Sequence, residues 1–166
     1  MLVNLLESDT SNEHVVISLL SDDSILTPSI KFKYRFLFLN VGGFFDLIAK
    51  FLNLIAIIKK ERPTLIQTWL YQGNLIGGLA AKISGVSSVY WGVHHTDFGG
   101  SKTSNLTWLA FIFSLPLSYM VPKRIIFCST SSLEMHVSRG YRKDFSVVIP
   151  NGHNTFLFKK NAPILV

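Results

Sequence analysis

Short apolar runs alternate with longer amphipathic segments along most of this chain. A short run of apolar and β-branched residues that is bounded by polar residues, glycine or proline is typical of a strand covered on both faces. Such runs predict strands at residues 14–20, 36–39, 65–68, 88–92, 124–127 and 146–149.

The segments between these runs carry the apolar spacing of helices. Pro63 follows the first segment and should stop its helix, whereas Pro116 should bend or end the third. Gly85 and Gly140 follow the second and fourth segments, where glycine commonly caps a helix. The predicted helices cover residues 44–60, 74–84, 106–119 and 131–139.

Strands that alternate with helices indicate parallel βαβ units. The sequence therefore predicts an α/β fold, namely a Rossmann-like three-layer α/β/α sandwich with a mainly parallel sheet. Ligands bind to sheets of this kind at the carboxyl ends of the strands. That edge would be formed by the loops at residues 69–73, 94–100, 129–132 and 151–154.

Composition narrows the class of protein. The chain has 166 residues, of which 48% are hydrophobic and 16% charged, so it can bury the core of one domain and is not disordered. The net charge is +6, but the basic residues are scattered in small groups, which argues against a nucleic-acid interface. An anionic membrane surface or a phosphorylated substrate fits this charge at least as well. The single cysteine, Cys128, forms no disulfide within the chain and favours a reduced cytoplasmic setting.

Residues 103–121 form the best candidate for a membrane helix, because they carry no charge. A spanning helix needs about 20 mostly apolar residues, and Pro116, Asn105 and several hydroxyl side chains weaken that interpretation. We expect a buried helix here, with an interfacial or spanning helix as the alternatives. The amino-terminal segment lacks a basic leader, so we do not expect a signal peptide.

Two adjacent histidines, His94 and His95, follow the fourth predicted strand and open a polar loop. Side chains alternate along a strand, so only one of the two rings can point into a cleft. A histidine there could hydrogen-bond a phosphate or a sugar hydroxyl or accept a proton, and it could equally bond to the backbone. Asp97 is too close in sequence to complete a metal site convincingly, so we expect no metal.

Three further groups of residues would reach the same edge. Ser129 begins a run of hydroxyl residues that should cap a helix and whose amides could also hold a phosphate. Trp69 and Tyr71 flank a strand end, where an aromatic ring either stacks on a sugar or packs at the rim. Pro150 ends the last strand, and the Asn-Gly turn after it suits the exit from a domain. The glycine motifs that cradle phosphates are absent from the sequence.

From residue 14 to residue 158 the chain resembles the N-terminal, acceptor-side domain of a retaining GT-B glycosyltransferase of family 4. The order and spacing of several segments carry this resemblance together. The matching segments are residues 57–69 (IIKKERPTLIQTW), 77–86 (GGLAAKISGV), 90–96 (YWGVHHT), 125–129 (IIFCS), 136–141 (HVSRGY) and 148–152 (VIPNG).

The resemblance implies two Rossmann-like domains with the active site between them. A nucleotide-sugar donor would bind mainly to the C-terminal domain, and a lipid-linked or glycan acceptor would bind to the N-terminal domain, without a metal or another cofactor. His95, with His94 as the alternative, would face the transferred sugar. The resemblance also implies that Trp69, Tyr71 and Thr96 line the acceptor side and that Ser129, Asn151 and Gly152 form the donor-side rim of the cleft.

The chain also departs from the family pattern. Residues 1–152 would form the N-terminal domain without its first strand, and residues 153–166 would begin a linker to an absent C-terminal domain. The missing strand would be central, so the strands at 14–20 and 65–68 would lose their shared neighbour. We therefore expect a fragment that folds poorly alone and acts with a separate C-terminal half, in the cytoplasm or at the inner face of the plasma membrane. The alternative is a non-catalytic acceptor-binding module or an inactive remnant.

Overall fold

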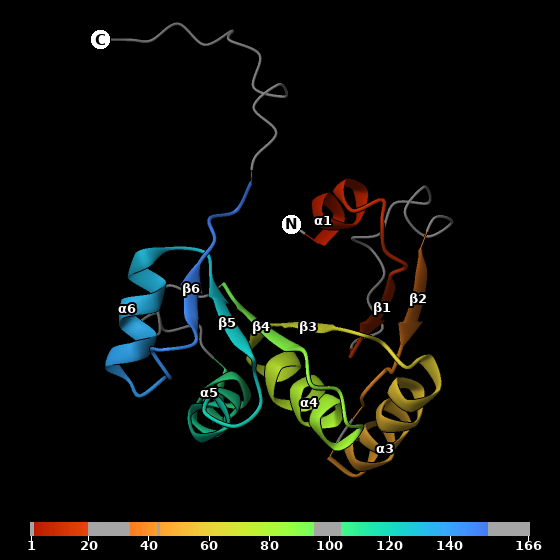
Figure 1. Cartoon of the computed structure of the whole chain (residues 1–166). Coiled ribbons are helices and arrows are strands. Elements are labelled where there is room, and N and C mark those ends of the chain that lie inside the picture. Colours follow the sequence, from red (N-terminus) through yellow and green to blue (C-terminus); the bar gives the residue numbers. More distant parts are fainter. Residues whose placement is uncertain (1, 20–33, 43, 95–103, 153–166) are drawn as a thin grey trace, which may run out of the picture.

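The structure is a computed structural model of the chain and describes residues 2–19, 34–42, 44–94 and 104–152 (Figure 1). Its strands are β1 (Val15–Ser18), β2 (Arg35–Phe38), β3 (Ile66–Trp69), β4 (Val89–Val93), β5 (Arg124–Phe127) and β6 (Ser146–Val148). Its helices are α1 (Leu2–Ser8), α3 (Phe44–Glu61), α4 (Leu70–Ile83), α5 (Asn105–Leu117) and α6 (Thr130–Ser138).

The described strands form two parallel sheets. One sheet has the order β1-β2, and the other has the order β3-β4-β5-β6. Every pairing is parallel, with Val15 opposite Arg35 in the first sheet and Ile66 opposite Val89 in the second. The α/β class and the parallel pairing predicted from the sequence are confirmed. The described strands divide into two sheets, because β1 and β3 share no strand neighbour among the described residues.

Two hydrophobic clusters hold the layers together. The larger lies around β4 and β5 and includes the fully buried residues Trp91, Ile125 and Phe127. The smaller joins the two sheets, because residues of α3 and α4 pack against side chains from both of them. Its buried members are Leu39, Leu54, Ile58 and Ala80, and its partly buried neighbours include Ile17 of β1 and Ile66 of β3.

Helix α4 begins earlier than the sequence predicted. Leu70 follows β3 directly and has a φ of 64°, so the chain turns from strand to helix within one residue. The predicted loop at 69–73 is therefore the first turn of a helix rather than an open loop. Asn74, which looked like a residue at the start of a helix, lies inside α4 and is completely buried.

Helix α5 is covered on one side only. Ser104 caps its start by accepting a hydrogen bond from the Thr107 N–H, and the helix ends one residue after Pro116, as predicted. Ala110, Phe111 and Ser114 are buried. The structure thus corrects the expectation of a buried helix, since several large apolar side chains on α5 are exposed. Within the described part of the chain, no helix has the length and apolar character needed to cross a membrane.

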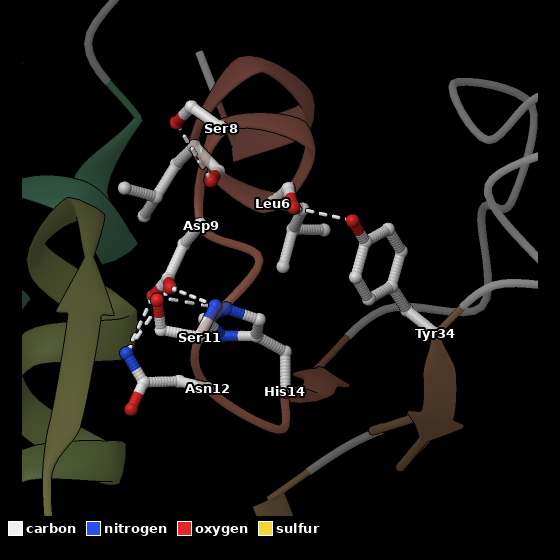
Figure 2. A network of polar contacts seen from close by, with 8 residues as sticks. Leu6, Ser8, Asp9, Ser11, Asn12, His14 and Tyr34 are labelled. Atoms are coloured by element: carbon white, nitrogen blue, oxygen red, sulfur yellow. Dashed lines mark hydrogen bonds and ion pairs between the residues drawn. The ribbon is translucent and has the colours of Figure 1, made fainter.

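Helix α1 is fastened to the first sheet by polar contacts (Figure 2). The Tyr34 hydroxyl, just before β2, donates to the carbonyl oxygen of Leu6. The Asp9 carboxylate accepts hydrogen bonds from the Asn12 side chain and the Ser11 N–H, and it lies 3.2 Å from Nε2 of His14. These hydrogen bonds, the Asn12 side chain first, lower the pKa of Asp9. The contacts fix how α1 leads into β1.

Candidate functional site

The helices in the second half of the chain begin at the carboxyl edge of the β3–β6 sheet. Strands β3, β4 and β5 are followed by α4, α5 and α6 respectively, and all four strands run parallel. Their carboxyl ends therefore lie at one edge, where this class of sheet binds ligands. The predicted site residues in the described part of the chain come from this edge.

A buried polar network sets the spacing of β3 and β4 at this edge. The Thr68 hydroxyl donates to Oδ1 of Asn74 at 2.7 Å, and Nδ2 of Asn74 donates to the carbonyl oxygen of Gly92 at 3.2 Å. Thr68 and Asn74 are both buried. A buried amide satisfied on both sides is costly to disturb. The network therefore ties the end of β3, the second turn of α4 and the end of β4 into one unit.

Trp69 occupies the edge beside the end of β4. Its indole lies against Gly92, where an added Cβ would come within 2.7 Å of Cδ1 of Trp69. Glycine at position 92 therefore allows the ring to lie across the backbone of β4. Trp69 is half-buried at the edge where the sequence placed an acceptor contact.

Tyr71, the second predicted aromatic contact, is a core residue. Its side chain is 1% exposed, and its hydroxyl lies 2.6 Å from Nε2 of His136. The other ring nitrogen of His136 lies 2.6 Å from the carbonyl oxygen of Ser132, so Nδ1 carries the proton and Nε2 accepts from Tyr71. Burial raises the pKa of the Tyr71 hydroxyl. The sequence missed this inward direction because it placed Tyr71 in a loop, whereas the first turn of α4 points it at α6.

Only one residue of the histidine pair lies among the described residues. His94 follows β4 directly, is half-buried, and has its Nε2 atom shielded from solvent. His95 and Thr96 lie outside the described residues, as does most of the predicted loop at 94–100. The roles predicted for His95, His94 and Thr96 therefore remain predictions.

The predicted rim residues come from two neighbouring strands. Ser129 follows β5 and caps α6, since its hydroxyl oxygen accepts from the Ser132 N–H at 3.2 Å. The capping role expected for this hydroxyl is confirmed. Asn151 and Gly152 follow β6 and are exposed. Just before them, the Ile149 N–H donates to the carbonyl oxygen of Phe127. Since β5 and β6 are paired and parallel, these residues share one edge.

A second polar contact links the starts of α4 and α5. Nε2 of Gln72 donates to Oγ1 of Thr107 at 2.9 Å, and Oγ1 of Thr107 lies 2.9 Å from Oγ of Ser104. Sequence reasoning did not single out Gln72, Asn74 or Thr107. The available signal was the presence of amide and hydroxyl side chains in otherwise apolar helices, since buried polar groups need partners.

The described residues contain no group of three His, Cys, Asp or Glu side chains that could hold a metal ion. Cys128 is half-buried with a free thiol. The polar groups at the edge are thus amides, hydroxyls and an imidazole, which suit hydrogen bonds to sugar hydroxyls.

The comparisons with known proteins agree with this architecture. The sequence model of Glycosyltransferase Family 4 matches residues 11–155. Crystal structures of HepE from Anabaena have the same fold: the complex with UDP and glucose has a TM-score of 0.69 at 17% identity and covers 90% of this chain. The HepE complex with UDP has a TM-score of 0.64 at 14% identity over 86% of this chain.

This chain corresponds to only part of such a protein. It spans 39% of the HepE chain in the complex with UDP and glucose. None of the curated protein sequences matches this chain. The family match nevertheless covers most of the sequence, and the chain therefore belongs to glycosyltransferase family 4.

Proposed function

We propose that this chain is the acceptor-side domain of a retaining glycosyltransferase, which moves a sugar from a nucleotide-sugar donor to a lipid-linked or polysaccharide acceptor. The family match over residues 11–155 carries this proposal. The solved HepE structures contain UDP with glucose, UDP-glucose or UDP, which supports a nucleotide-sugar donor. In this proposal the C-terminal half of the enzyme supplies the main donor pocket.

The proposed roles follow the carboxyl edge of the sheet. His95, or alternatively His94, donates a hydrogen bond to the transferred sugar or takes a proton from it. Trp69, which lies across Gly92 beside the end of β4, and Thr96 contact the acceptor. Ser129, Asn151 and Gly152 form the donor-side rim. We assign no acceptor contact to Tyr71, because its buried hydroxyl instead positions the first turn of α4 against His136.

We also propose that the protein works at the inner face of the plasma membrane, where a lipid-linked acceptor is presented. Helix α5 supports this, because its exposed side chains include Leu109 and Phe113, which are 51% and 59% exposed. Basic side chains follow α5 in the sequence and would favour an anionic lipid surface. The exposed ones are Lys123, Arg124, Arg139 and Lys143.

Sugar transfer can be tested in extracts of source cells that lack this chain. UDP-glucose with a radioactive sugar is added with the purified chain, and label is followed into the lipid and polysaccharide fractions. We expect label in one of these fractions only when the chain is added, and we expect His95→Ala to abolish it. Asn53→Ala, an exposed change on α3, is the control that should transfer sugar normally.

The second candidate function is a non-catalytic acceptor-binding module or an inactive remnant. The observation that favours it is the 39% coverage of HepE, since the match corresponds to less than half of that chain. Retention of a lipid-linked sugar by the chain without label transfer would support the binding module. If neither label transfer nor acceptor retention is observed, both active functions are contradicted and the inactive remnant is left.

A further inference from the structure

An open hollow lies at the amino edge of the β3–β6 sheet, between the ends of α3 and α4. Its volume is about 430 Å³. Two loops line it, residues 62–64 before β3 and residues 84–87 before β4, together with Ile58 and Lys59 at the end of α3. The candidate functional site is at the carboxyl edge, so the hollow is separate from it.

Regular packing, rather than one loop, holds the hollow in shape. Helices α3 and α4 pack against each other (Figure 1). Oγ of Ser84, at the end of α4, donates to the carbonyl oxygen of Ile55 in α3 at 3.5 Å. The Ile66 N–H donates to the carbonyl oxygen of Ser88 at 3.0 Å, which ties the two loops together where β3 and β4 begin. The two halves of the lining are therefore fixed relative to each other.

The hollow carries positive charge without an internal counter-charge. Lys59 and Arg62 line it and are exposed, and none of the described lining residues is acidic. Glu61, which lies between them in sequence, forms an ion pair with Arg35 of β2 instead. Neither Lys59 nor Arg62 has an ion-pair partner in the described part of the chain. An anionic group in the hollow would therefore be stabilised by both cations.

The backbone at Arg62 indicates that its side chain has a use. Helices α3, α4 and α6 are each followed by a residue in the left-handed region, namely Arg62, Gly85 and Gly140, with φ values of 49°, 85° and 105°. Glycine is favoured at this position, because a Cβ there crowds the neighbouring carbonyl oxygen. The arginine after α3 opposes this preference, and such local strain often marks a functional position.

Hydroxyl groups and volume narrow the class of anion. Thr64 and Ser87 line the hollow, and neither hydroxyl has a hydrogen-bond partner among the described residues. Lysine, arginine and hydroxyl groups are suitable donors to the terminal oxygens of a phosphate. The volume of about 430 Å³ lies within the usual range of small-molecule sites, about 300–1,000 Å³, so an organic group fits beside the phosphate.

We propose that this hollow binds a small phosphomonoester, with Lys59 and Arg62 on its phosphate group and Thr64 and Ser87 as further hydrogen-bond donors. The ligand would bind the domain without entering the candidate functional site. Binding here requires no sugar transfer, so it stands or falls separately from the proposed function.

The competing explanation for these residues is structural. Cations in the last turn of a helix stabilise the helix end through its dipole. Lys59 and Lys60 both lie in the last turn of α3, whereas Lys60 does not line the hollow and Arg62 follows the helix. Stability and ligand affinity must therefore be measured separately.

A titration followed by nuclear magnetic resonance locates the site. Glucose 6-phosphate is added to the full chain labelled with ¹⁵N-glycine. Gly85 lines the hollow, and Gly140, which has the same left-handed backbone and lies next to Arg139, is the control for general attraction to basic residues. We expect a saturating shift of the Gly85 amide signal and little change at Gly140. No shift at Gly85, or equal shifts at both glycines, would overturn the site.

Arg62→Gly separates ligand binding from folding. Glycine relieves the left-handed backbone, so this variant should unfold at a higher urea concentration than the wild type. It should nevertheless bind glucose 6-phosphate tenfold or more weakly. A variant that is more stable but binds with unchanged affinity would show that the arginine has no part in a ligand site, and the proposal would be wrong.

Two further variants form a matched pair in the last turn of α3. Lys59→Gln should weaken binding about as much as Arg62→Gly does. Lys60→Gln removes the same charge from the neighbouring position outside the hollow and should change the affinity less than about twofold, since exposed charges are screened by salt. Equal losses from the two would mean that only general electrostatic attraction is present, which would overturn the site.

Two simpler ligands show which part of the molecule is recognised. Glucose without phosphate should leave the Gly85 signal in place, and a shift as large as that with glucose 6-phosphate would overturn the role of the two cations. Weaker binding of inorganic phosphate than of glucose 6-phosphate would support a phosphomonoester. Equal binding of the two would overturn recognition of the organic part and leave a site for phosphate alone.

Discussion

Gly92 shows how one missing side chain shapes the carboxyl edge. A methyl group at this position would lie 2.7 Å from Cδ1 of Trp69 and 3.2 Å from the carbonyl oxygen of Thr68. We expect Gly92→Ala to lower the free energy of unfolding by about 1–3 kcal/mol and to shift the tryptophan fluorescence, because the Trp69 ring must move.

Gly73 offers a matched control for this substitution. It lies inside α4, and a Cβ there would meet nothing within 4 Å. Gly73→Ala should therefore raise the free energy of unfolding by about 0.5–1 kcal/mol, since alanine favours a helix over glycine. Both changes are measured by urea unfolding. Equal effects of the two would refute the close approach of Trp69 to β4.

Asn74 is the buried residue that joins three elements, and its energy can be measured by a double-mutant cycle. Asn74→Ala leaves the Gly92 carbonyl and the Thr68 hydroxyl without this partner, so we expect a loss of about 1–3 kcal/mol in the free energy of unfolding. Combined with Thr68→Val, the loss should be smaller than the sum of the two single losses. Asn53→Ala on the exposed face of α3 is the control with little effect.

Residue types predicted local geometry well where a backbone requirement was specific. Gly85 and Gly140 end α4 and α6 with φ values of 85° and 105°, and Ser129 caps α6. Tyr71 was placed wrongly because its direction depends on Leu70. A non-glycine residue at a positive φ is uncommon, so no residue type at this position indicated that α4 begins there.

At the scale of elements, α5 carries more exposed large apolar side chains than α4 or α6 among the described residues. Arg142 joins the segment after α5 to the residues before β6, since its guanidinium lies 3.5 Å from the centroid of the Phe145 ring and donates to the carbonyl oxygen of Tyr119. An apolar helix face next to basic residues is suited to an anionic lipid surface. The exposed apolar residues of α5 are Leu106, Trp108, Leu109, Ile112 and Phe113.

Vesicle binding tests this role of α5. We expect the chain to bind phosphatidylglycerol vesicles more tightly than phosphatidylcholine vesicles. This difference in affinity should become smaller at high salt. Leu109→Ser with Phe113→Ser should weaken binding by tenfold or more, because each removes apolar area from the contact. Ile48→Ser with Leu52→Ser is the control on α3, with exposed fractions of 52% and 61% against 51% and 59% on α5. Equal losses from both pairs would argue against an α5 surface.

The element order was the most predictable feature, because apolar periodicity reports burial directly. The predicted strand at 124–127 has the observed bounds, and the helix predicted at 44–60 runs from Phe44 to Glu61. The uncovered face of α5 was not predictable, since an apolar helix in a core and one at a surface have similar sequences. Its position follows only from how α4 packs against it.

At the scale of the whole molecule, the division into two sheets follows from the long-range order of strands. The resemblance implied that the strands at 14–20 and 65–68 are not direct neighbours, and among the described residues β1 and β3 do not pair with each other. The site could be predicted only as an edge, because the side chains that meet there come from separate βαβ units. The contact of Gln72 with Thr107 joins two such units and has no local sequence signature.

The buried tyrosines make the stability of the whole domain sensitive to alkaline pH. Burial raises the pKa of both Tyr71 and Tyr141 above the ordinary value of 10.0. Below pH 10 both rings are neutral in the folded and the unfolded chain. As the pH rises above 10 only the unfolded chain loses these protons, so the free energy of unfolding should fall by up to about 1.4 kcal/mol per pH unit for each tyrosine.

Urea unfolding between pH 8 and pH 11.5 measures this slope. Tyr71→Phe with Tyr141→Phe should lower stability at pH 8, because the contacts with His136 and Ser114 are lost, yet it should flatten the decline above pH 10. Tyr119→Phe, on a side chain that is 54% exposed, should leave the slope unchanged. A double variant with the full wild-type slope would mean that neither hydroxyl is buried in the folded domain, and the packing of α4 against α6 through Tyr71 and His136 would then be wrong.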